Sequence, residues 1–202
     1  MDAKTESRVA DVTEITQLVL RERQGRDRGW WTQMEESFHA DASVFVSWFR
    51  GPAAEFIRGS QAMFAAGNCP VHRLSPPVVQ LSGERAVVEV PASIEVRSVL
   101  EGVESDLASY TRLLYQVQRY DGAWLIRDLS CVYERDTLTP ALPGATIPLD
   151  LERLNQFRMP YRYLAYHVTT HGGSVGDGLY GDDEPERLEE LYADALDWMR
   201  QQ

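Results

Sequence analysis

The sequence predicts an α+β fold, a cone in which helices cover the concave side of a strongly curved, mostly antiparallel sheet. Two turn signals carry this prediction: Asp121-Gly122 is a strong two-residue hairpin signal, and Glu101-Gly102 is a second turn candidate. The flanking side chains alternate, so three long strands are expected in succession between residues 84 and 136. A bent sheet closed by helices on one side leaves an apolar interior in which a pocket forms.

The first part of the chain predicts two helices. Apolar residues recur at helical spacing over residues 9–24, and Gly25 and Gly29 are expected to loosen the chain before the next helix. The second helix presents one apolar face, formed by Trp31, Met34 and Phe38.

The middle of the chain predicts a strand, a helix and an edge strand. Residues 43–49 alternate weakly, as in a short strand. Pro52 opens a third helix at a favoured first-turn position, and Gly67 ends that helix. The extended stretch over residues 71–81 is interrupted by Pro76-Pro77, which favours an edge or bent strand.

A linker after Asp136 divides the chain. Residues 1–142 are expected to form the cone domain, and residues 143–202 a helical extension. The extension is expected to contain a helix interrupted at Pro160 over residues 150–170, a Gly- and Asp-rich mobile loop over 171–185, and an amphipathic helix over 186–202.

The two turns also determine which side chains share a face of the sheet. The Glu101-Gly102 turn predicts three pairs: Val96 with Leu107, Ala92 with Thr111 and Val88 with Tyr115. The Asp121-Gly122 turn pairs Tyr115 with Asp128 and, by strict alternation, puts Asp128 in the middle of the apolar concave face. A carboxyl group in such a place has a raised pKa and can act as a proton shuttle or donor.

Composition bounds the partners. The chain has 202 residues, of which 44% are hydrophobic and 25% charged, as in ordinary globular proteins. A net charge of −11 argues against nucleic acids and anionic membranes as partners. No apolar run of about 18 residues exists, and the N-terminus lacks the apolar stretch of a signal peptide, so we expect a cytoplasmic protein.

Several cofactor chemistries lack their residues here. Lys4 is the single lysine, so neither a Walker-type phosphate loop nor a pyridoxal phosphate Schiff base has a positioned amine. Cys69 and Cys131 form no zinc pattern, and both are expected to be structural thiols. His167 and His171 are four residues apart, but a solvated pair is favoured over a metal site because no third ligand is near. We therefore expect neither a cofactor nor a metal.

Residues 9–136 resemble the nuclear transport factor 2 superfold, also described as cystatin-like, which includes scytalone dehydratase, the SnoaL-type polyketide cyclases and ketosteroid isomerase. The resemblance is carried by the break at Arg26-Asp27-Arg28-Gly29-Trp30-Trp31, by the His72 strand after the third helix, and by the Asp121-Gly122-Ala123-Trp124-Leu125-Ile126 hairpin. Because this superfold hosts many functions, the resemblance constrains the fold more than the activity.

The dehydratase branch matches at two positions. Asp27 resembles the cavity aspartate of that branch, and His72 resembles its cavity histidine. The family's tyrosine before the aspartate is Arg26 here, and a second cavity histidine falls near Arg97. A different substrate, or a function other than dehydration, would explain both departures.

Four residues are catalytic candidates. His72 is the candidate base, with an exposed edge-strand histidine as the alternative. Asp27 either orients His72, acts as a base, or caps the second helix. Asp128 and Tyr115 are candidate proton donors; the alternatives are a structural aspartate satisfied by Tyr115 and Ser130, and a core tyrosine. The expected substrate-binding residues are Trp31, Trp48, Val90, Thr111, Leu113 and Ser130.

Three functions follow from these residues and the resemblance. The first is a cofactor-independent acid/base enzyme, a dehydratase, isomerase or cyclase, acting on a mid-sized apolar or aromatic carbonyl compound. The second is a noncatalytic assembly subunit, comparable to dioxygenase β subunits, in which the cone is filled. The third is a small-molecule binding protein without chemistry.

We also expect a homodimer or small symmetric oligomer. The row predicted on the convex face is too rich in aromatic and apolar groups for an ordinary solvated surface. The row consists of Glu89, Ser93, Glu95, Tyr110, Arg112, Leu114, Leu129, Cys131 and Tyr133.

Overall fold

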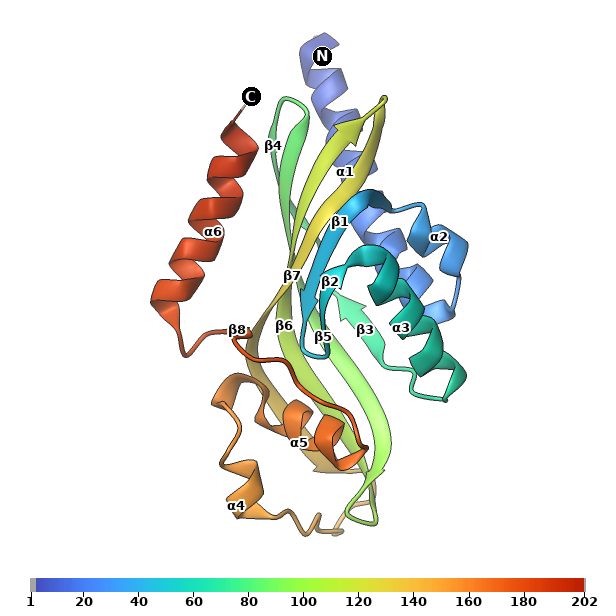
Figure 1. Ribbon diagram of the computed structural model, residues 1–202, viewed down its shortest axis with the longest axis vertical. Helices are drawn as coiled ribbons and strands as arrows, with labels where there is room; N and C mark the ends of the chain where they lie inside the picture. The colour runs from blue at the N-terminus through green and yellow to red at the C-terminus, as the bar shows by residue number, and fades with distance from the viewer. Residues whose placement is uncertain (1–2, 202) are drawn as a thin grey trace.

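A curved sheet runs the length of the molecule in the computed structural model, which describes residues 3–201 (Figure 1). The strand order is β2-β1-β7-β6-β5-β3; β4 pairs with β5, and β8 pairs with β7. Neighbours are antiparallel except that β7 runs parallel to both β1 and β8. The strands are β1 (Phe38–Val46), β2 (Phe49–Pro52), β3 (Val71–Leu74), β4 (Val78–Ser82), β5 (Arg85–Leu100), β6 (Val103–Tyr120), β7 (Ala123–Pro140) and β8 (Tyr180–Gly181).

Two tight turns join the three long strands, as predicted. Glu101 and Asp121 each have a φ of 49°, and the glycines that follow, Gly102 and Gly122, have φ values of 79° and 87°. Two successive residues with positive φ match the right-handed twist of the strands, which is why an acidic residue followed by glycine joins each pair.

The register between β5 and β6 is confirmed throughout. Val96 pairs with Leu107, Ala92 with Thr111 and Val88 with Tyr115. This pairing puts the even-numbered side chains of β5 on the inner face, where they join the main core.

The predicted register between β6 and β7 is wrong beyond its first pairs. Val117 pairs with Ile126 as expected, but a β-bulge follows and Gln116 pairs with Asp128, which leaves Arg127 as the extra residue. Because the side-chain period of a strand is two, the inserted residue moves the side chains of β7 that follow, as far as Tyr133, to the opposite face. Asp128 therefore lies half-buried on the outer face and not beside Tyr115. A second register shift, between Tyr110 and Thr111 of β6, then reverses this change.

The bulge increases the apolar content of the core. Leu129, Cys131 and Tyr133 now point inward and are buried, although the convex row had included all three. The Asp128 carboxylate instead accepts hydrogen bonds from the Ser43 and Ser130 hydroxyls of the outer face.

Three helices cover the inner face of the sheet, as predicted: α1 (Ala3–Arg28), α2 (Trp31–Glu35) and α3 (Ala53–Ala65) (Figure 1). Helix α1 is longer than expected, because Gly25 does not break it and the chain leaves the helix only at Gly29, with a φ of +68°. Helix α2 is shorter than expected, because Phe38 already begins β1.

The C-terminal part covers both faces of the sheet. Helices α4 (Leu151–Leu154), η1 (Met159–Tyr161) and α5 (Arg162–Thr170) follow β7, and side chains of η1 and α5 join the inner core. Helix α6 (Pro185–Arg200) packs on the outer face against Val87 and Leu114. Its Tyr192 hydroxyl donates to the Glu89 carboxylate at 2.6 Å.

The convex row is therefore split: α6 covers part of it, and three of its members lie in the core. Association into a homodimer and the division of the chain at residue 142 stay predictions. Among residues 3–201, none of the helices combines the length and the apolar character that crossing a membrane would require.

Candidate active site

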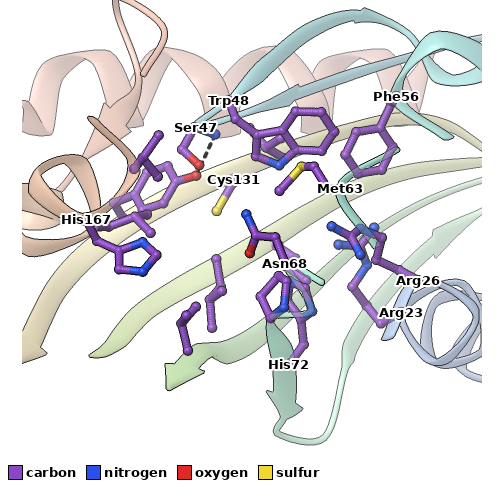
Figure 2. A pocket seen from close by; sticks show the side chains of 18 residues that line it. Arg23, Arg26, Ser47, Trp48, Phe56, Met63, Asn68, His72, Cys131 and His167 are labelled. Atoms are coloured by element: carbon purple, nitrogen blue, oxygen red, sulfur yellow. Dashed lines mark hydrogen bonds between the residues drawn. The ribbon is translucent and has the colours of Figure 1, made fainter. Parts of the chain in front are cut away.

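A cavity of about 70 Å³ lies between the helices and the inner face of the sheet (Figure 2). Its walls come from α1, the β1–β2 turn, α3 and the loop after it, strands β3, β5, β6 and β7, and α5. The lining residues are Arg23, Arg26, Val46, Ser47, Trp48, Phe56, Met63, Asn68, Pro70, His72, Ile94, Val96, Leu113, Cys131, Tyr133, Leu164, His167 and Val168.

His72 and Asp27 form a hydrogen-bonded pair beside this cavity. His72 lies on β3, where it pairs with Ile94 of β5, and Asp27 comes from the last turn of α1. The His72 Nδ1 lies 2.6 Å from Asp27 Oδ1, and the His72 backbone N–H donates to Asp27 Oδ2 at 2.7 Å. Asp27 does not cap α2, which begins without a side-chain cap. Both carboxylate oxygens thus hold the histidine in place.

The electrostatics of this pair favour a neutral imidazole beside an ionised carboxylate. Burial alone would raise the pKa of Asp27, but the hydrogen bonds and charge of His72, with Arg23, hold it below its ordinary value. Burial lowers the pKa of His72; Arg23 and Arg26 lower it further, against the opposing effect of Asp27. Because an ionised carboxylate can only accept, Nδ1 carries the proton and Nε2 carries the lone pair that can accept one.

A buried ion pair lies next to the histidine. The Arg23 guanidinium donates through Nε and Nη2 to the two oxygens of Glu22, whose side chain is fully buried. The Tyr115 hydroxyl donates to the same carboxylate at 3.2 Å. Tyr115 is therefore a core residue: its hydroxyl is hydrogen-bonded to Glu22, and its side chain does not line the cavity.

Arg26, one turn of α1 further on, is a buried cation without such a partner. Its side chain lines the cavity, the residue is 2% exposed, and among the described residues no hydrogen-bond acceptor faces its Nη1. Burial and the neighbouring Arg23 lower the pKa of Arg26 to about 10, so it still carries its charge at neutral pH.

The opposite end of the cavity is formed by the C-terminal part. Asp136 of β7 accepts the backbone N–H of Leu164 at 2.8 Å and so fixes α5 against the sheet. His167 of α5 is buried, and its Nε2 lies 2.8 Å from the Ser98 hydroxyl of β5. Burial lowers the pKa of His167 to about 4. Figure 2 shows His167 at one end of the cavity and the two arginines at the other.

A wider surface hollow of about 440 Å³ adjoins the cavity. The two spaces share Met63, Asn68, Val96 and His167. Asn68 is exposed and lies just after α3, so this is the side from which a ligand can enter.

The structure brings some of the predicted site residues together and separates others. His72, Trp48 and Leu113 line the cavity, with Asp27 directly behind His72. The others do not line it: Tyr115 and Val90 are core residues, Thr111 donates to the Ala92 carbonyl, Trp31 packs edge-on against Phe64, and Asp128 and Ser130 lie on the outer face.

Sequence reasoning did not assign several polar lining residues to the cavity, among them Arg23, Arg26, Tyr133 and His167. The spacing of three between Arg23 and Arg26 was an available signal, because residues three apart share a helix face. Predicting Tyr133 at the cavity would have required knowledge of the bulge. Predicting His167 there would have required the path of the C-terminal segment, for which the sequence offered no template. Within residues 3–201, His, Cys, Asp and Glu side chains form no group of three or more that could hold a metal ion.

The family model for the SnoaL-like domain matches residues 7–130. The chain belongs to the SnoaL-like family. An uncharacterised protein of Emericella nidulans is 30% identical over 189 residues, covering 86% of this chain and 79% of that protein. A PEP2-like protein of Fusarium vanettenii is 32% identical over 184 residues, with the same coverage. Pea pathogenicity protein 2 of the same fungus is 30% identical, covering 73% of this chain and 65% of that protein.

Solved structures show the same cone fold. A type 2 hexachlorocyclohexane dehydrochlorinase aligns with a TM-score of 0.55 and 14% identity, over 70% of this chain and 97% of that one. A protein of Novosphingobium aromaticivorans, provisionally described as a scytalone dehydratase, aligns with a TM-score of 0.53 and 17% identity, over 72% and 97%. The predicted fold and superfamily are thereby confirmed, and lyase-type enzymes occur among proteins with this fold.

Proposed function

We propose that this protein is a cofactor-independent acid/base enzyme, a lyase or isomerase, that removes a proton from a carbon next to a carbonyl group. His72 is the base, and Asp27 is the positioning residue that orients it. The supporting observation is the pair itself, a buried neutral imidazole whose Nδ1 is held by a carboxylate beside a cavity.

The reaction needs a proton acceptor and a donor for the carbonyl oxygen. His72 Nε2 takes the proton as the C–H bond breaks, and the electron pair of that bond forms the enolate. The resulting imidazolium then returns that proton, either to a leaving hydroxyl in an elimination or to another carbon in an isomerisation. No external oxidant or reductant enters either route.

Tyr133 is the candidate donor in place of Tyr115. It lines the cavity, and burial raises its pKa well above 10, so the phenol stays protonated. Its oxygen already accepts the Ser47 backbone N–H at 2.8 Å. That bond fixes the ring and strengthens the phenol as a donor toward a developing oxyanion.

The size of the cavity bounds the substrate. A volume of about 70 Å³ is well below the roughly 300–1,000 Å³ of ordinary ligand pockets. A mid-sized carbonyl compound therefore extends past Met63 and Asn68 into the adjoining hollow, with its reacting end inside. Trp48, Phe56 and Leu113 supply the apolar wall that such a compound requires.

The test is proton exchange in D₂O, followed by NMR, with a panel of hydroxyketones, aryl ketones and keto acids. The native protein should remove substrate C–H signals or form product, and His72→Gln should slow this by about two to four orders of magnitude. His39→Gln is the matched control, because His39 stacks on Tyr120 away from the cavity. Equal rates for His72→Gln would refute the proposal; binding without exchange across the panel would favour the binding-only function.

A further inference from the structure

Arg26, at the end of the cavity where His72 lies, is near the charges of Asp27 and Glu22 but has a buried donor, Nη1, that no acceptor satisfies among residues 3–201. Figure 2 shows Arg26 at the same end of the cavity as Arg23, near His72. A guanidinium in such a place is normally paired, because an ion removed from water needs a counter-charge or hydrogen bonds.

The nearby carboxylates are already engaged. Glu22 accepts from both Arg23 and Tyr115. Asp27, the residue after Arg26, accepts from His72 through each of its oxygens. Neither carboxylate is hydrogen-bonded to Arg26, so its buried Nη1 is available to an acceptor on a ligand.

We propose that the substrate carries a carboxylate group, which binds the Arg26 guanidinium and so places the neighbouring carbon beside His72 Nε2. The chemistry at that carbon rests on the proposed function, but the recognition does not. A guanidinium and a carboxylate match in charge, planarity and spacing, and they form parallel hydrogen bonds. A phosphate fits less well, since it brings nearly two charges and more acceptor oxygens to a single free guanidinium.

The remaining lining fixes the orientation of such a substrate. Phe56 lies close to the arginines, and His167 of α5 lies at the other end of the cavity. The carboxylate thus occupies the arginine end, and the apolar body extends toward His167. Recognition at the charged end would determine which carbon meets the base.

Carboxylate binding also changes the base. The charged groups that face His72 are Asp27, Arg23 and Arg26, all from α1. The two arginines oppose protonation of the imidazole, and a bound carboxylate neutralises the one that has no partner. The pKa of His72 should therefore rise on binding, which makes it a stronger base only when substrate is present.

The experiment compares crotonate with crotonamide, which have nearly the same shape and differ in charge. Binding is followed by NMR through the Arg26 Nε–H and the His72 ring. Crotonate should bind at least about tenfold more tightly than the amide, as expected for charge-assisted hydrogen bonds. Arg26→Met should remove this preference. His72→Gln should retain it, as should Arg73→Gln, which alters an exposed arginine paired with Glu95.

Equal affinity for the two probes, failure of both to bind, or an unchanged preference in Arg26→Met would overturn the inference. If Arg26→Met does not fold, the native protein decides, because its Arg26 signal must shift with crotonate and stay in place with crotonamide. A carboxylate preference in a protein that turns over no compound would preserve the inference while refuting the proposed function. Turnover of neutral ketones without any carboxylate preference would do the reverse.

Discussion

The cavity contains two buried histidines from different regions, and they differ in their partners. His72 lies within the family-matched residues 7–130, while His167 lies beyond them, in α5. The first contacts a carboxylate and the second a serine hydroxyl. Burial disfavours the charged form of both, but only at His72 does a carboxylate stand ready to stabilise a transient imidazolium. The hydrogen-bond partner, and not burial, therefore distinguishes His72, a candidate base, from His167, a neutral residue of the cavity wall.

Removing the carboxylate partner should have the largest effect on activity. Asp27→Asn replaces an acceptor with an amide that can also donate a hydrogen bond. The His72 proton is then no longer held on Nδ1, and Nε2 is no longer kept free to accept a proton. Turnover should fall by at least about two orders of magnitude, as for other histidines that lose their orienting aspartate. Because Asp27 raises the pKa of His72, the acidic limb of the remaining pH–rate profile should move to lower pH.

Asp41→Asn is the control for that variant, because Asp41 is exposed and its neighbour His39 lies outside the cavity. A pH–rate profile that is the same in Asp27→Asn and in the native protein would show that the two histidines do not differ as described.

The buried, neutral His167 should make the free energy of unfolding depend on pH in the acid range. Its pKa of about 4 in the folded protein lies below the ordinary 6.5, so between these values the unfolded chain binds a proton that the folded protein does not. The stability present above pH 6.5 is lost as the pH falls toward 4, by about 3 kcal/mol in total. His167→Gln should lose less over this range in urea unfolding, whereas His39→Gln, whose ring stacks on Tyr120 away from the cavity, should follow the native protein.

If His167→Gln and the native protein show parallel stability curves, His167 is not held neutral by burial. A loss of the acidic limb of the pH–rate profile in His167→Gln would show that His167 takes part in the chemistry. Either result would contradict the distinction between His72 as the base and His167 as a neutral lining residue.

The smallest effect on turnover is expected from substitution of Asp128. Burial raises its pKa, but it lies on the outer face, where Ser43 and Ser130 donate to it. Asp128→Asn should leave turnover and its pH dependence unchanged and alter the free energy of unfolding by about 1 kcal/mol or less. A shifted pH–rate profile in this variant would mean that the outer face takes part in the chemistry.

The sequence predicted the fold because its strongest signals are local. Each acidic residue followed by glycine determines a turn, and each turn determines the pairing that follows it. The prediction failed where pairing ceased to be regular. A bulge at Arg127 exchanged the faces of β7 as far as Tyr133, although the apolar Leu129, Cys131 and Tyr133 indicated which register buries more apolar surface.

The candidate site was predicted only in part, for a different reason. His72 and Asp27 are 45 residues apart, and the resemblance supplied their proximity. His167 meets Ser98 across 69 residues, and no turn or periodicity in the sequence links them. The free charge of Arg26 depends on which neighbours are already paired, and a helical pattern does not specify that.

The nitrogen NMR signals of His72 report the protonation state and tautomer of its ring without any substrate. At neutral pH we expect a neutral ring with its proton on Nδ1 and a lone pair on Nε2, and a pKa below the ordinary 6.5 when the site is free. A protonated ring at neutral pH, or a neutral ring with its proton on Nε2, would contradict the assignment of His72 as the base.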